Sequence, residues 1–190
     1  RMSPPTRLRA PARLGAATLR VANAACAGAI CLLAVAGCAG GGLVGDTYMG
    51  DGYMFTVQPP RSDWQRLDIE GANLAYRSDT HQATMLINGR CGRNTDDVPL
   101  TALTNHLFFQ FTDREVIKQE TVPFDGREAM HTVMDAKLDG VALRYDVWVL
   151  KKDNCVYDLL FLAPATSFDG GHADFQAVVQ GFTASREGAP

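Results

Sequence analysis

The sequence lacks the short motifs that mark the commonest catalytic and metal sites. No serine lies in a Gly-x-Ser-x-Gly pattern, which excludes the usual nucleophile elbow of hydrolases. The chain has no His-Glu-x-x-His pattern, no EF-hand loop and no Cys-x-x-Cys pair, and no two of its four histidines stand at a spacing typical of metal ligands. We therefore expect a protein that is not an enzyme and that holds no cofactor and no metal.

Acidic residues are absent from the first 37 positions, which contain five arginines, and residues 21–37 carry no charge at all. A basic start followed by a short apolar stretch rich in small residues is typical of a secretory signal. The apolar stretch is shorter than the roughly 20 apolar residues that a membrane-spanning helix needs. A signal-anchor helix that continues to Val44 remains the alternative, since no charge lies between Arg20 and Asp46. However, Gly40, Gly41 and Gly42 would weaken such a helix.

The end of this stretch, Val35-Ala36-Gly37-Cys38, resembles the lipobox of bacterial lipoproteins. The resemblance implies that the Cys38 thiol receives a diacylglycerol and that cleavage removes residues 1–37 as a lipoprotein signal peptide. In that family an aspartate after the cysteine retains the protein at the inner membrane. Ala39 therefore favours the periplasmic face of the outer membrane over the inner membrane, in an organism that has both. An ordinary cysteine beside an ordinary cleavage site is the alternative.

Without residues 1–37 the chain has 153 residues, a length typical of one domain. Thirteen basic residues then stand against 21 acidic ones, so the net charge is −8 instead of −3. An acidic surface without a basic stripe argues against nucleic acid as a partner. It also argues against electrostatic docking on anionic lipids, so the predicted membrane attachment depends on the acyl chains of Cys38.

Two further cysteines, Cys91 and Cys155, lie outside the predicted signal. An exported protein folds in an oxidising compartment, where an even pair of cysteines is a candidate disulfide. Two separate buried thiols are the alternative, because free cysteine is often buried.

Composition divides the exported part into three segments. Residues 38–52 contain six glycines and are expected to form a flexible tether for the lipid anchor. Residues 53–184 are expected to form one globular domain, and residues 185–190 a frayed polar tail.

Within the domain, period-two alternation and turn residues predict strands, and two stretches show helical spacing. Leu100, Leu103, Leu107 and Phe111 recur at intervals of three and four, and residues 175–182 predict a C-terminal helix after a flexible Gly170-Gly171. The expected strands are 53–57, 64–69, 74–77, 83–88, 115–122, 127–137, 141–150 and 155–162. An antiparallel sheet flanked by helices, an α+β fold, buries these faces most simply.

This order of elements resembles the PsbP-like fold, named for the extrinsic subunit P of photosystem II. The resemblance covers residues 53–183 and depends on a first strand that ends at Pro59-Pro60, on Trp64, on the central helix and on the closing segment 175–182. It implies an α/β/α sandwich and roles in binding and assembly instead of catalysis. No functional residue carries over from it.

One pair of carboxylates presents a geometric question. Asp146 and Asp158 lie on consecutive expected strands. If the numbers of two directly opposite residues on these strands add up to an even number, both carboxylates lie on the same face of the sheet, together with Arg144. The odd-numbered apolar residues of both strands favour an even sum. Two close carboxylates raise one pKa, as in acid/base pairs. A solvated strand face or an ion pair with Arg144 is the ordinary alternative.

The sequence therefore predicts a membrane-anchored envelope lipoprotein that binds a protein partner in assembly or transport. The alternative function is a carrier or sensor of a small hydrophobic or lipidic ligand, bound between sheet and helix. A large apolar cavity lined by residues such as Phe108, Phe109, Tyr145 or Phe161 would favour that alternative.

Overall fold

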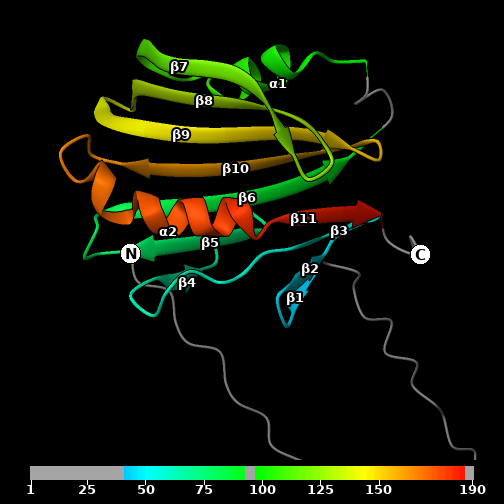
Figure 1. The fold of residues 1–190 in the computed structure, drawn as a ribbon. Coiled ribbons are helices and arrows are strands. Elements are labelled where there is room, and N and C mark those ends of the chain that lie inside the picture. Colours follow the sequence, from blue (N-terminus) through cyan, green and yellow to red (C-terminus); the bar gives the residue numbers. More distant parts are fainter. Residues whose placement is uncertain (1–40, 93–96, 187–190) are drawn as a thin grey trace, which may run out of the picture. The chain divides into compact units, whose positions relative to one another are not determined.

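The computed structural model describes residues 41–92 and 97–186. The predicted signal and Cys38 lie outside the described residues. The described part is a mixed α+β fold of two antiparallel sheets and two helices (Figure 1). The predicted fold class is confirmed.

A seven-stranded antiparallel sheet forms the centre of the fold, in the order β4-β5-β6-β10-β9-β8-β7. Its strands are β4 (Gln65–Leu67), β5 (Leu74–Ser78), β6 (Ala83–Cys91), β7 (Thr112–Phe124), β8 (Arg127–Leu138), β9 (Val141–Lys152) and β10 (Cys155–Ala163). All seven were expected from the sequence. Tight turns join β7 to β10 in succession, and Asp125, Asp139 and Asp153 adopt positive φ there, a conformation that Asn, Asp and Gly tolerate best.

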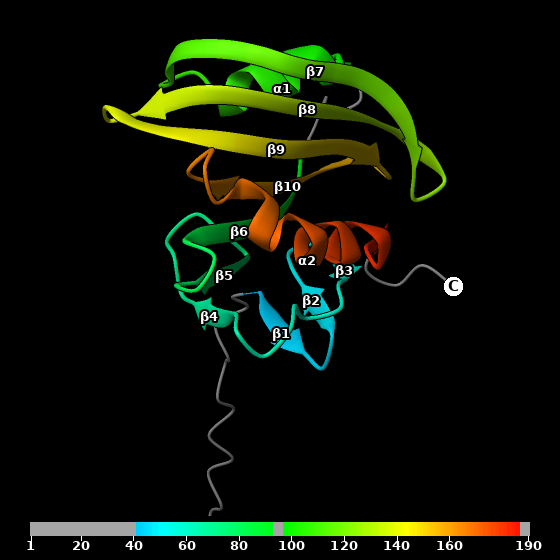
Figure 2. The ribbon, with the colours of Figure 1, turned by 60° about the vertical axis from the view of Figure 1, so that its left-hand side comes forward.

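Two helices cover opposite faces of this sheet, which makes it the middle layer of an α/β/α arrangement (Figures 1 and 2). Helix α1 (Leu100–Leu107) packs on β8 and β9, and helix α2 (Phe168–Gln180) packs on β6 and β10. Phe111 was expected inside α1 but lies just after it, in a turn, and still packs on the α1 side of the sheet.

Each face of the sheet has its own hydrophobic core. The core under α2 contains aromatic residues such as Phe55, Tyr157, Phe161 and Phe175, all fully buried. The core under α1 is smaller and is built from β8, β9 and β10 around Tyr145 and Val147. Because both faces are buried, successive residues of β9 and β10 alternate between two apolar environments instead of between core and solvent.

A second, four-stranded sheet has the order β1-β2-β3-β11. Its strands are β1 (Gly42–Val44), β2 (Thr47–Met49), β3 (Tyr53–Thr56) and β11 (Thr183–Arg186). Of these, only β3 was expected. Tyr48, Phe55 and Ala184 of this sheet belong to the core under α2.

Three boundaries expected from the sequence need correction. Residues 42–49 form the hairpin β1–β2, so this part of the predicted 38–52 tether is folded. Ser185 and Arg186 belong to β11, and residues 187–190 lie outside the described residues. Helix α2 begins at Phe168 and includes Gly170 and Gly171, which were expected to be a flexible lead-in.

Candidate functional site

The carboxylates of Asp146 and Asp158, which would be close together if they shared a face, lie on opposite faces of the large sheet. Asp146 of β9 is opposite Phe161 of β10, and Asp158 is opposite Val149. Paired positions therefore sum to an odd number, contrary to the even sum favoured by the sequence. The odd-numbered apolar residues of β9 face α1, whereas those of β10 face α2.

Asp158 forms a structural ion pair on the α1 side of the sheet. It is almost fully buried, Arg90 pairs with its Oδ1 atom, and the amide of Asn88 donates a hydrogen bond of 2.9 Å to Oδ2. Arg144, expected beside the two aspartates, instead forms a two-pronged pair with Asp135, at 2.7 and 2.9 Å.

Asp146 is the centre of a buried polar cluster on the α2 side, and it is fully buried. Nε2 of His131 lies 2.8 Å from Asp146 Oδ1, and Nε2 of His172 lies 2.7 Å from Oδ2. Gln176, one turn after His172 on α2, donates a hydrogen bond of 3.1 Å to Oδ2. The ring of His131 also stacks on Trp148 at a centroid distance of 4.2 Å.

The ionised form of Asp146 is favoured by this environment. Burial raises the pKa of Asp146, but the hydrogen bonds and charge interactions with His131 and His172 lower it by more, so the pKa lies below its ordinary value. The contacts given above contain no hydroxyl or thiol that could act as a nucleophile. The cluster therefore ties α2 to β8 and β9. Sequence reasoning missed it because its members lie on three separate elements.

Two surface pockets border helix α1. The first, here called the C-terminal α1 pocket, has a volume of about 500 Å³ and lies between the second half of the helix and strands β7 and β8. It is lined by Thr104, Asn105, Phe108, Phe109, Arg114, Val116, Gln119, Thr132 and Met134. The pocket contains Phe108 and Phe109, two of the residues named for a ligand cavity, but its lining does not include Tyr145 or Phe161.

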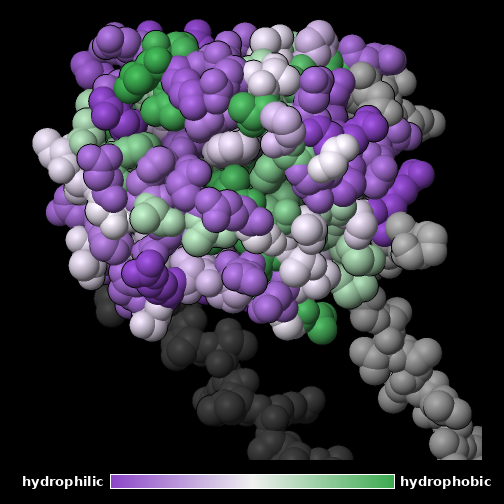
Figure 3. Space-filling view, in the orientation of Figure 1, coloured by the Kyte–Doolittle hydropathy of each residue, from purple (hydrophilic) through white to green (hydrophobic). Residues whose placement is uncertain are grey.

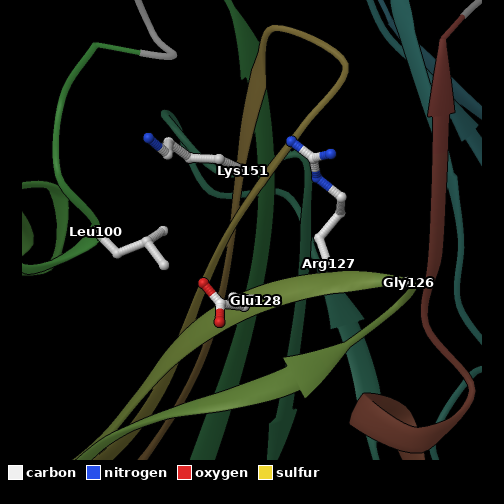
Figure 4. Close-up of a pocket in the computed structure, with 5 residues that line it drawn as sticks. All are labelled: Leu100, Gly126, Arg127, Glu128 and Lys151. Carbon is white, nitrogen blue, oxygen red and sulfur yellow. The ribbon is translucent and has the colours of Figure 1, made fainter.

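The second pocket, here called the N-terminal α1 pocket, has a volume of about 460 Å³ and lies at the start of the helix. Its lining residues are Leu100, Gly126, Arg127, Glu128 and Lys151 (Figure 4). Leu100 projects from α1 towards the sheet, and Glu128 rises from β8 to face it. Lys151 also donates a hydrogen bond of 2.9 Å to the carbonyl of Val98.

Two exposed apolar side chains, those of Phe109 and Val116, line the C-terminal α1 pocket. Phe109 is 83% exposed, and Val116 and Ile117 of β7 are both more than half exposed. On the α2 side of the molecule the surface is mostly polar, with a hydrophobic group over β7 at the upper left (Figure 3). Arg114, in the same pocket, makes a hydrogen bond of 3.4 Å to the carbonyl of Phe108.

The other site residues predicted from the sequence are the three cysteines Cys38, Cys91 and Cys155. Cys91 and Cys155 are directly opposite each other on β6 and β10 and form a disulfide, as predicted. Cys38 lies outside the described residues, so its lipidation stays a prediction. Within residues 41–92 and 97–186, no helix is long and apolar enough to cross a membrane.

The sequence predicted no metal site, but the structure brings three ligand-type side chains together. Asp63, His81 and Asp174 each offer one ligand atom, and these atoms lie within 4.8 Å of one another. The three residues come from the β3–β4 loop, the β5–β6 turn and α2.

No protein-family model matches the chain, and no curated protein sequence does. The fold is similar to that of CyanoP, the cyanobacterial PsbP of Synechocystis sp. PCC 6803, with a TM-score of 0.50 and 15% identity over 70% of this chain and 87% of CyanoP. It is also similar to LpqN, which is involved in cell envelope biogenesis of Mycobacterium tuberculosis, with a TM-score of 0.50 and 13% identity over 72% of this chain and 87% of LpqN. A Bacteroides thetaiotaomicron structure matches with a TM-score of 0.50 and 15% identity over 72% of this chain, which spans only 46% of that protein. The chain thus has a PsbP-like fold.

Proposed function

We propose that this chain is a non-catalytic accessory factor of the bacterial cell envelope that binds a partner protein along α1. The observation that carries the proposal is the open C-terminal α1 pocket of about 500 Å³, beside which Phe109 and Val116 are exposed. Exposed apolar side chains around a hollow are typical of interaction sites. Aromatic side chains such as that of Phe109 are enriched in the cores of protein interfaces.

The charges along α1 indicate the chemistry of the partner. The two pockets contain three basic side chains, Arg114, Arg127 and Lys151, and one acidic side chain, Glu128. This local basic excess contrasts with a chain whose net charge is −3. A segment that carries acidic side chains next to an apolar anchor is complementary to such a surface.

The irregular edge strand β7 favours a partner that docks on the face near α1 over a partner that adds a strand to the sheet. β7 is the last strand of the sheet, but two register irregularities interrupt its pairing with β8, between residues 112 and 115 and between 116 and 118. Bulges and charged side chains at an edge discourage the addition of another strand. Asp113, Glu115, Lys118 and Glu120 supply such charges.

The resemblance of Val35-Ala36-Gly37-Cys38 to a lipobox and one of the structural neighbours support the envelope as the location. LpqN is an envelope biogenesis protein and shares the fold, although the likeness at 13% identity extends to the fold alone. We propose anchoring through acyl chains on Cys38, at the periplasmic face of the outer membrane. Separation of the inner and outer membranes tests both points. Cys38→Ala should block lipidation and the cleavage that follows it, so this variant should keep residues 1–37 and be absent from the outer-membrane fraction, where we expect the wild type. Recovery of the variant with the outer membrane, at the processed length of the wild type, would contradict the lipid anchor.

Site-specific photo-crosslinking in native membranes tests the binding surface. A crosslinkable residue at position 109 should give one defined protein adduct, and Arg114→Glu in the same chain should reduce its yield at least about tenfold. The control position is 141, because Val141 is also exposed (58%) but lies at the start of β9, beside the β8–β9 turn, and does not line the pocket. Equal labelling from positions 109 and 141, or labelling unchanged by Arg114→Glu, would refute the proposed surface.

A small hydrophobic or lipidic ligand is the second candidate, because Phe108 and Phe109 both line the C-terminal α1 pocket and its volume is in the range of small-molecule sites, about 300–1,000 Å³. Native mass spectrometry of the protein extracted from membranes would detect it. A stoichiometric small molecule that Phe109→Asp releases, without any protein adduct at position 109, would favour this alternative.

A further inference from the structure

Far from α1, three potential metal ligands converge where α2 meets the β3–β4 loop and the β5–β6 turn. Nε2 of His81 lies 2.8 Å from Oδ2 of Asp63. Asp174 of α2 completes the group, and one ligand atom from each residue lies within 4.8 Å of the other two. Since tetrahedral zinc places its ligands about 2.0–2.2 Å from the ion, small side-chain movements would bring the three atoms to one metal.

Asp174 is held in place by groups around it. Nε1 of Trp64 donates a hydrogen bond of 3.1 Å to Asp174 Oδ2. Nε of Arg61 lies 2.9 Å from Oδ1. Asp174 is only 7% exposed, whereas the Arg61 side chain is 79% exposed. Trp64 thus fixes the carboxylate as an outer-shell partner would, and Arg61 supplies a positive charge that can swing into solvent.

Two glycines of α2 let His81 approach the helix. A Cβ atom at Gly170 would lie 3.2 Å from Nδ1 of His81. A Cβ atom at Gly171 would lie 3.2 Å from Cβ of His81 and 3.0 Å from Cζ2 of Trp64. These distances are tighter than ordinary contacts. The imidazole is therefore packed between α2 and the Trp64 ring, whose centroid is 5.9 Å away, with Nε2 directed at Asp63.

We propose that Asp63, His81 and Asp174 form a binding site for a divalent transition-metal ion, with Zn²⁺ as the best match. One imidazole and two carboxylates suit Zn²⁺, whereas Ca²⁺ and Mg²⁺ prefer ligand sets made of oxygen. Three protein ligands leave a fourth position for water or an external ligand. The ion replaces Arg61 at Asp174 and links the loop, the turn and the helix. This site is independent of the α1 pockets.

Calorimetric titration of the purified, untagged full chain with ZnCl₂ tests the proposal. We expect one ion per chain, and no heat from MgCl₂ or CaCl₂ at the same concentration. His81→Ala and Asp63→Asn should each weaken Zn²⁺ binding at least about tenfold, because each removes one of three ligands. His106→Ala is the matched control, since His106 is exposed on α1 and distant from the site.

Arg61→Ala gives a prediction of opposite sign. Removing the competing cation from Asp174 should tighten Zn²⁺ binding several-fold, and a nonspecific surface site would not respond in this way. Far-ultraviolet circular dichroism without metal shows whether each variant is folded. Wild-type affinity in His81→Ala, loss of binding in His172→Ala instead, or no tightening in Arg61→Ala would each overturn the proposal.

Discussion

Replacing Asp146 with asparagine keeps the size of the side chain but removes the charge at the centre of the buried cluster. The carboxylate interacts with His131, His172 and Gln176 and is fully buried. Breaking a buried charged pair from one side costs about 3–5 kcal/mol, and asparagine retains one of the two acceptor oxygens. We expect the free energy of unfolding to fall by about 3 kcal/mol, which lowers the Tm of a domain of this size by about 6–12 °C.

Asp135→Asn is the matched control, because Asp135 lies on the neighbouring strand β8 and pairs with Arg144 at 2.7 Å. Its side chain is 37% exposed, so solvent screens the pair and the expected loss is about 1 kcal/mol or less. Urea unfolding followed by circular dichroism measures both variants. Equal losses in the two variants would refute the reasoning that burial makes the Asp146 cluster the stronger of the two.

The pH dependence of the same pair of proteins gives a second test. The pKa of Asp146 is lowered in the folded state, because the hydrogen bonds and charge interactions with the two histidines together outweigh burial. A lowered folded-state pKa contributes stability above the unfolded-chain pKa of about 3.9, and this contribution is lost as the pH falls through the folded-state pKa. The stability difference between wild type and Asp146→Asn should therefore be full at about pH 5 and shrink below about pH 4. A difference that stays constant down to about pH 2.5 would contradict it.

Three further predictions concern the core and the disulfide. Tyr145→Phe should raise the free energy of unfolding by about 1 kcal/mol in urea titrations, because the buried Tyr145 hydroxyl has no hydrogen-bond partner among the described residues; a loss of stability would contradict this. Burial raises the pKa of Tyr145 and of Tyr157 to about 12. Ultraviolet titration should therefore show two of the five tyrosines ionising only near that pH. The free energy of unfolding should fall as the pH rises above the unfolded-chain tyrosine pKa of about 10. Reducing the disulfide between Cys91 and Cys155, which are 64 residues apart, should lower the free energy of unfolding by about 4 kcal/mol, measured as Tm with and without a reductant; an unchanged Tm would show that the bond does not constrain the unfolded chain.

Local patterns predicted most of the fold. The strands β7 to β10 are 9 to 13 residues long and are separated by turn residues, so their expected ranges agree with the structure to within three residues at each end. The strands β1, β2 and β11 have only three or four residues each. Segments this short have no readable period, and pairing with β3 decides their conformation.

The start of α2 was missed for a different reason. Gly170-Gly171 weakens a helix when only local propensity is considered. In the folded protein the two glycines allow His81 and Trp64 to pack against the helix. Packing on the sheet therefore overrides the local preference.

The sequence by itself determined the signal-like first 37 residues, the lipobox resemblance at Cys38, the α+β class and the pairing candidates Cys91 and Cys155, because each depends on local composition, periodicity or an even count. Only the tertiary structure decided which charged residues meet. Asp146 and Asp158 lie on opposite faces of the large sheet, contrary to the face-sharing that the pattern favoured. The sheet is buried on both faces, so the alternation of apolar residues does not reveal which helix a given residue faces. The contacts of Asp146 with His172, and of His81 with Asp174, join strands or turns to α2 across more than 25 positions of sequence. Such contacts are set by how α2 packs on the sheet, which no short stretch of sequence encodes.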